Sequence, residues 1–191
     1  YSLLESFFTS LQVLRAHQRG VLSLDQTLGD FFPDVPQVSS LTIHELLSHR
    51  SGVMEIADDD FYHDDELLII QRSSPRVSKE DHRIHRSNGM FLRTTLSRIE
   101  GEPFVDVLMK EEWFSQYIQR ESVSRTEKPL QRKEKDIKHS IFSQEQFCDL
   151  ISALKEGELG VEWSQQVQSY LGLQTHLYGQ EEVLQIVEHK E

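Results

Sequence analysis

The opening segment of the chain is an amphipathic helix whose apolar face is too wide to be left in water. Residues 3–19 carry apolar side chains at helical spacing, and Gly20 ends the pattern. Burial of one Leu or Phe side chain stabilises a fold by about 1.5–3 kcal/mol, so this helix must pack against other elements. An uncovered face of this kind would favour self-association. The apolar positions are Leu3, Leu4, Phe7, Phe8, Leu11 and Leu14.

The size and composition of the chain fit one domain with a single core. The chain has 191 residues, of which 37% are hydrophobic and 27% charged, so residues 1–191 are predicted to form one domain. No apolar run approaches the ~20 residues that a membrane-spanning helix needs. The net charge of −12 argues against a nucleic-acid surface, because such a surface needs clustered Lys and Arg. Residues 116–138 are predicted to be a charged connector.

Two single residues bear on processing and redox chemistry. The first residue is Tyr1 and no basic stretch leads into an apolar targeting segment, so we expect the start of the chain to be processed or truncated. The one cysteine, Cys148, excludes internal disulfides and a cysteine-rich zinc site, and its helical pattern favours burial. Neither residue identifies a cellular compartment.

The remaining patterns are mainly helical. Thr42 and Glu45 form a capping box, so a short helix is expected there, ending near His49. The other expected elements are helices at 89–100, after Pro103 and from Ser143 with Gln146 as a second capping box, an extended connector at 21–36, an irregular polar stretch at 73–87 and a strand at 183–187.

Two histidine pairs are candidate metal ligands, and the first fails on geometry. His44 and His49 are five residues apart, which places them about 140° apart around a helix, so they cannot bind one ion from a regular helix. His82 and His85 are three residues apart, but no obvious third ligand lies nearby. The acidic stretch 58–66 lacks the glycine and glutamate pattern of a calcium loop. We predict no metal and no cofactor, and keep a metal-dependent hydrolase using His82, His85 and the acids as an alternative.

The one S-x-x-K sequence, Ser152 to Lys155, is expected to be a chance match. With 21 Ser and 8 Lys in 191 residues, about one such pair arises by chance. Leu154, inside the sequence, belongs to the apolar stripe of a predicted helix. The chain has no glycine-rich phosphate loop, Cys-His nucleophile pair or G-x-S-x-G turn.

The stretch GVLSLDQTLGDFFPDVPQVSSLTIHELLSHRSGV, residues 20–53, resembles a segment of the β-lactamase-related serine hydrolases, which include class C β-lactamases, penicillin-binding DD-peptidases and related esterases. HRSNGMFL with RIEGEPFVDVL, and IFSQEQFCDLISALKEGEL, resemble later segments of that family more weakly. The resemblance implies an α+β fold in which a helical domain packs beside an antiparallel sheet. The chain would then be a single, incomplete domain, mainly α, with little of the sheet. The matching residues are Gly20, Leu22, Leu24, Asp25, Pro33, Thr42, Ile43, Leu46, Leu47, His49, Ser51 and Gly52.

The same resemblance implies that the family's catalytic motifs are not intact. Its S-x-x-K motif falls on residues 3–6, so Leu3 stands in place of the nucleophilic serine and Ser6 in place of the lysine. Its Y-x-N motif falls on residues 86–88. Arg86 replaces the tyrosine and stays protonated, so it cannot be a general base.

Two further positions complete the comparison with the family. Asn88, the only asparagine, falls where the family's substrate-orienting amide stands, and it could bind a ligand amide or cap a helix. The third motif, (K/H)-(T/S)-G, has His189 to Glu191 as its only counterpart, and this lacks the glycine. The second motif therefore survives only at Asn88, and the third is expected to be absent.

These replacements predict a catalytically inactive relative, a pseudoenzyme or truncated copy. Loss of a covalent nucleophile costs a serine hydrolase on the order of 10⁶ in turnover. A remaining role would be binding of a peptide, a peptidoglycan-like or small acyl ligand, or a protein partner. The alternative is an active serine hydrolase of the β-lactamase, DD-peptidase or esterase type that uses Ser2 or Ser6 with an unconventional base.

Overall fold

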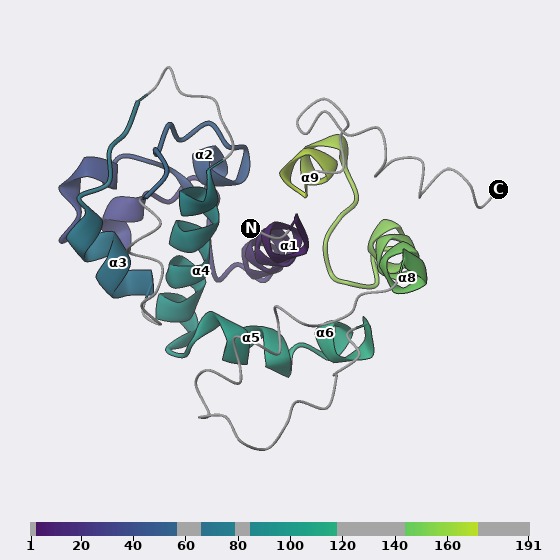
Figure 1. Ribbon diagram of the computed structural model, residues 1–191. Helices are drawn as coiled ribbons and strands as arrows, with labels where there is room; N and C mark the ends of the chain where they lie inside the picture. Colours follow the sequence, from purple (N-terminus) through teal and green to yellow (C-terminus); the bar gives the residue numbers. More distant parts are fainter. Residues whose placement is uncertain (1–2, 57–65, 79–84, 118–143, 172–191) are drawn as a thin grey trace. The chain divides into compact units, whose positions relative to one another are not determined.

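A computed structural model describes residues 3–56, 66–78, 85–117 and 144–171 (Figure 1). They fall into two compact units. Of the described residues, the first unit contains those up to Gly101 together with Ser169–Leu171, and the second contains those from Glu102 to Gln168. Whether the whole chain is a single domain stays a prediction.

In the first unit, three helices pack against α4 (Arg86–Glu100): α1 (Leu3–Gln18), α2 (Ile43–Leu47) and α3 (Glu66–Ser73) (Figure 1). Every residue of α4 from 87 to 96 is buried, which its central place explains. The sequence predicted this helix from residue 89, and it begins three residues earlier. It ends at Gly101, whose φ of 73° is left-handed and therefore suits glycine.

The predicted opening helix is confirmed as α1, and its apolar face is covered from Phe7 to Leu14. All side chains from Phe7 to Leu14 are buried, including the polar Thr9, Ser10 and Gln12. In this part of α1 the polar side chains between the predicted apolar positions are therefore buried as well. Because this part of the helix is covered, it offers no exposed apolar face for self-association, which stays a prediction.

The connector after α1 is folded into turns, so the extended form predicted for residues 21–36 is wrong. It contains two short 3-10 helices, η1 (Leu28–Asp30) and η2 (Pro36–Val38). The Leu28 amide donates to the Leu41 carbonyl at 2.7 Å, which closes the connector into a loop. Proline has a fixed φ that suits the first residue of a helical turn, so Pro36 begins η2 rather than extending the chain.

The capping box at α2 is confirmed. The Glu45 amide donates to Thr42 Oγ1 at 3.2 Å, and the Thr42 amide donates to Glu45 Oε2 at 2.8 Å. The helix ends at Leu47, and His49 lies beyond it with a left-handed φ of 55°. A metal pair of His44 and His49 on one helix is therefore excluded for a second reason.

The second unit contains four helices among its described residues: α5 (Phe104–Lys110), α6 (Glu112–Tyr117), α8 (Gln144–Lys155) and the start of α9 (Gln165–Tyr170). The helices expected after Pro103 and near Gln146 are confirmed as α5 and α8. The sequence did not predict α3, α6 or α9. Cys148, expected to be buried, is only half-buried on α8. Most of the predicted connector 116–138 and Ser143 lie outside the described residues.

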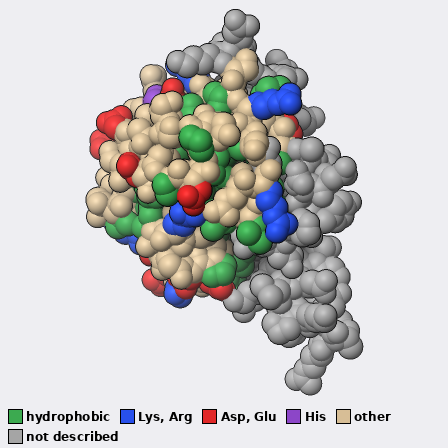
Figure 2. Space-filling model, turned by 90° about the vertical axis from the view of Figure 1, so that its left-hand side faces the viewer, with side chains coloured by type: hydrophobic (Ala, Val, Ile, Leu, Met, Phe, Trp, Pro, Cys, Tyr) green, Lys and Arg blue, Asp and Glu red, His purple; other side chains and the backbone are tan. Residues whose placement is uncertain are grey.

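Paired β-structure among the described residues is limited to two isolated bridges, Thr27 with Thr42 and Val53 with Val77. The predicted strand at 183–187 lies outside the described residues, so the α+β fold stays a prediction. No described helix has the length and apolar character needed to cross a membrane. On the face in Figure 2, acidic and basic side chains are interspersed.

Candidate functional site

The family's first and second catalytic motifs fall on α1 and α4, two helices that contact each other. Leu3 is the first residue of α1, and Ser6 is half-buried one turn later. Residues 86–88 are the first three residues of α4, which packs against α1. The side chain of Leu3 and all of Ser2 lie outside the described residues.

The first turn of α4 is bonded to residues 49–56, called here the 49–56 segment. Arg86, Ser87 and Asn88 are consecutive, and each bonds this segment with its own side chain. We call this set of bonds the clasp. The clasp joins the loop after α2 to the N-terminal end of α4. This end of α4 corresponds to the family's second motif.

Arg86 forms the outer part of the clasp. Its backbone amide donates to Glu55 Oε2 and its Nε donates to Glu55 Oε1, both at 2.8 Å. His85 Nδ1 lies 3.3 Å from Glu55 Oε2. Both side chains of the Arg86–Glu55 pair are about one third exposed, at 33% and 34%. A carboxylate therefore neutralises the guanidinium that stands where the family resemblance implies a tyrosine.

Ser87 bonds the backbone of the segment from below the surface. Its hydroxyl donates to the Met54 carbonyl at 3.1 Å and accepts the Ile56 amide at 3.0 Å. The Ser87 side chain is fully buried, so its hydroxyl depends on these two backbone groups for its hydrogen bonds. Ser87 thus fixes the path of the chain between Met54 and Ile56.

Asn88 forms the inner part of the clasp. Ser51 Oγ donates to Asn88 Oδ1 at 2.6 Å, and Asn88 Nδ2 donates to His49 Nδ1 at 3.2 Å. Ser51 Oγ also accepts the Val53 amide at 3.1 Å. Only 1% of Asn88 is exposed. The interpretation of Asn88 as a helix cap is wrong, because the cap position is His85 and Asn88 lies inside α4. Its role toward a ligand stays a prediction.

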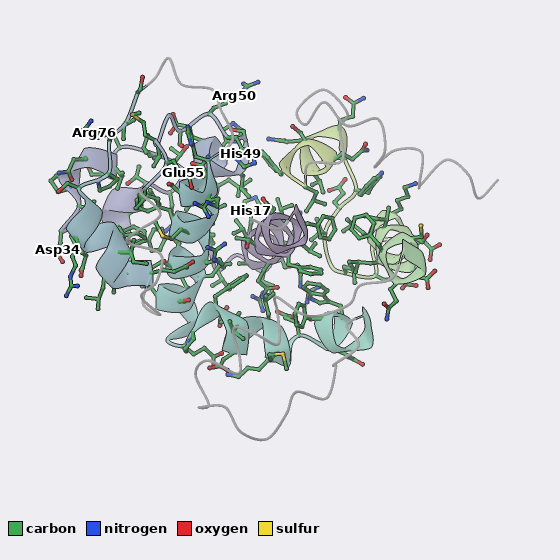
Figure 3. The ribbon with its side chains drawn as sticks, in the orientation of Figure 1. His17, Asp34, His49, Arg50, Glu55 and Arg76 are labelled. Carbon is green, nitrogen blue, oxygen red and sulfur yellow. The ribbon has the colours of Figure 1, made fainter. Side chains whose placement is uncertain are left out.

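His49 is a buried neutral imidazole in this arrangement. Burial, and then the charge of His85, lower the pKa of His49 from 6.5 to about 4. A neutral ring offers one nitrogen as an acceptor, which is what Asn88 Nδ2 requires. His49 and Glu55 both lie near the N-terminal end of α4, while Arg50 points outward (Figure 3).

A backbone pairing supports the far side of the 49–56 segment. The Met54 amide donates to the Arg76 carbonyl at 2.9 Å, and the Ser78 amide donates to the Gly52 carbonyl at 2.7 Å. These bonds flank the bridge of Val53 with Val77. The segment is therefore held between the start of α4 and residues 76–78.

Among the residues that the structure describes, the other candidates do not assemble into a site. His85 contacts Glu55, and its proposed metal partner His82 lies outside the described residues, as does most of the acidic stretch 58–66. Within the described part of the chain, no group of three or more His, Cys, Asp or Glu side chains is placed to hold a metal ion. Ser152 is exposed on α8 and donates to the Cys148 carbonyl at 3.0 Å. His189 to Glu191 also lie outside the described residues.

Sequence reasoning missed the partners of Asn88. From the sequence, Ser51 is only one of the residues that match the family segment, and His49 is one of two histidines that cannot bind one ion from a regular helix. Their shared role depends on a contact 37 to 39 residues along the chain, which spacing within one segment cannot reveal. The available signal was the single asparagine aligned with a family motif, since a buried amide needs polar partners.

Comparison with known proteins gives two matches. The family model described as Beta-lactamase matches residues 7–130. Among solved structures, the penicillin binding protein from Bacillus halodurans is similar with a TM-score of 0.57 and 19% sequence identity, over 90% of this chain and 63% of that chain. At this identity the likeness concerns the fold alone, and this chain spans less than two thirds of that protein. No curated protein matches the chain.

Proposed function

Since the chain belongs to the β-lactamase family, we propose that it is a member without acyl-transfer activity that keeps a binding role. Its fold is of the β-lactamase and penicillin-binding-protein type. The family model covers α1 from Phe7 onward, α2 and α4, so it includes residues 86–88, whereas Leu3 and Ser6 precede its first matched residue.

The observation that carries the proposal is the pairing of Arg86 with Glu55. A tyrosine in that position could exchange a proton with a reacting group. Arg86 instead stays charged and makes two 2.8 Å bonds to one carboxylate. An ion pair in this geometry has no proton to give or take near neutral pH, so the position acts in structure rather than in proton transfer.

The positions on α1 support the same proposal. The family resemblance puts Leu3 where a serine would attack and Ser6 where a lysine would accept its proton. A leucine side chain has no nucleophilic atom, and a serine hydroxyl is too weak a base to activate another hydroxyl. Loss of this pair lowers turnover by a factor on the order of 10⁶.

Catalysis is tested by hydrolysis at pH 7 of a chromogenic cephalosporin and of a p-nitrophenyl ester. We expect rates equal to those in buffer for both the native chain and Ser6→Ala. A rate above buffer that Ser6→Ala abolishes would instead support the alternative of an active hydrolase with an unconventional base. A rate that survives Ser6→Ala would direct the same test to Ser2→Ala.

The binding role is tested separately with the ligands that the family suggests. The structural neighbour is a penicillin-binding protein, so benzylpenicillin is the first probe, followed by a soluble peptidoglycan fragment. We expect saturable, reversible binding in isothermal titration calorimetry, with the protein recovered unmodified after dialysis. Heat equal to that of dilution for both probes would contradict a binding role toward acyl or peptidoglycan-like ligands.

A further inference from the structure

We propose that the 49–56 segment is an acid-released flap, in which uptake of one proton by His49 opens the clasp to α4. This inference concerns a conformational device and is independent of whether the protein binds the ligands named above. It rests on the hydrogen-bond directions inside the clasp, the charges around it and the loop structure of the segment.

The hydrogen-bond directions make the clasp sensitive to one proton. Asn88 Nδ2 can only donate, so His49 Nδ1 must accept across their 3.2 Å contact. A protonated imidazole carries hydrogen on both nitrogens and accepts at neither. Proton uptake at Nδ1 would therefore set two donors against each other in a buried site.

The surrounding charges oppose a compensating interaction. His85 raises the cost of a second positive charge at His49. The nearby carboxylate Glu55 is shared by Arg86 and His85. On the neighbouring helices, Glu45 is used in the α2 capping box and Glu66 pairs with Arg93. His44 of α2 pairs with the Tyr170 hydroxyl. These three described carboxylates thus have partners already.

The segment can move without dismantling α4. Outside the clasp, backbone bonds join it to Glu45 and Leu46 of α2 and to residues 76–78, and no helix passes through it. Its opening would release the Val53 and Ile56 amides from Ser51 and Ser87. Opening would also uncover the Asn88 amide, whose two ends could then pair with solvent or a ligand. Opening would also expose Val53 and Ile56, which are 0% and 4% exposed in the closed segment.

A competing response would keep the clasp closed. The Asn88 amide could rotate so that Oδ1 accepts from the protonated His49 and Nδ2 donates to Ser51. Ser51 would then have to direct its own proton elsewhere within a buried site, where only 2% of the residue is exposed. Amide rotation predicts an unchanged flap at low pH and therefore contradicts the proposal.

Amide hydrogen exchange on the intact chain tests the flap. Protection factors, corrected for intrinsic exchange at each pH, are compared at pH 7.5 and pH 4.5 for Val53, Met54, Ile56 and Ser78. A shift of the pKa of His49 from 6.5 to about 4 predicts that their protection falls by about 50-fold, while the α1 amides keep theirs.

Two variants make the result specific. In His49→Asn the left-handed backbone is tolerated and the side chain does not titrate, so protection of the segment should be equal at both pH values. His17→Asn changes a histidine outside the clasp, whose Nδ1 lies 3.0 Å from the Leu22 carbonyl oxygen. This variant should show the same loss of protection at pH 4.5 as the native chain. Equal protection in the native chain at both pH values, an equal loss in α1, or a pH response that survives in His49→Asn would each overturn the proposal.

Discussion

Glu66→Gln is expected to lower the free energy of unfolding by about 3 kcal/mol, because it removes the anion that balances a buried guanidinium. Arg93 lies in α4 with 9% of its side chain exposed, and its Nε donates to Glu66 Oε1 of α3 at 2.9 Å. A second bond from Nη2 reaches the same oxygen. Glutamine keeps the size and an acceptor but not the charge, so Arg93 stays buried without its counterion.

A matched variant separates this effect from the general cost of losing a surface charge. Glu100→Gln removes a carboxylate that pairs with Arg19 in the same unit at 3.3 Å, but those side chains are 31% and 45% exposed. We expect a loss below about 1 kcal/mol there. Urea unfolding followed by circular dichroism measures both variants. Equal losses would show that the Glu66–Arg93 pair contributes no more than a surface pair does.

Lowering the pH from 7.5 to 4 is expected to cost the fold about 3 kcal/mol through His49 alone. The pKa of His49 is about 4 in the folded chain and near 6.5 when the chain is unfolded. The unfolded state therefore binds more protons between these values. The stability is complete above pH 6.5 and is lost as the pH falls toward 4.

The His49 contribution is isolated by comparison with a variant, since carboxylates also titrate as the pH approaches 4. Free energies of unfolding are measured in urea at intervals between pH 7.5 and pH 4 for the native chain and for His49→Asn. The free energy of unfolding of the native chain, relative to that of His49→Asn, should fall by about 3 kcal/mol between pH 7.5 and pH 4. Parallel curves for both proteins would show that His49 is not a neutral buried group.

Local signals predicted the elements that depend on short-range chemistry. The apolar repeat from Leu3 to Leu14 and the Thr42 and Glu45 capping box each need residues within one or a few turns, and both were confirmed. The similarity of residues 20–53 to a known family was confirmed by the family model. These features are specified by side chains that are neighbours in the sequence.

Elements with mixed or short patterns were missed. Residues 67–70 are a continuous apolar run, which fits a buried helix or a strand equally, and they form part of α3. The six residues of α9 carry only one aliphatic residue, Val167, so no helical period is visible. In such segments, packing against the rest of the fold decides the structure.

The candidate site was predictable only in part. The family resemblance drew attention to Arg86 and Asn88, but not to the residues that bond them. Glu55, Ser51 and His49 reach the start of α4 through the path of the chain after α2, which is a property of the tertiary fold. The family motif thus identified Arg86 and Asn88 as positions of interest, and only the tertiary structure could identify the residues that bond them.

The central claim is that this β-lactamase-family chain lacks a nucleophile for acyl transfer, and intact-mass spectrometry tests it most directly. The protein is incubated with a fluorophosphonate and, separately, with benzylpenicillin, beside an active serine hydrolase as a positive control. We expect the mass of the chain to stay unchanged while the control is labelled. A covalent adduct on the chain, mapped by peptide sequencing to Ser2 or Ser6, would contradict the claim.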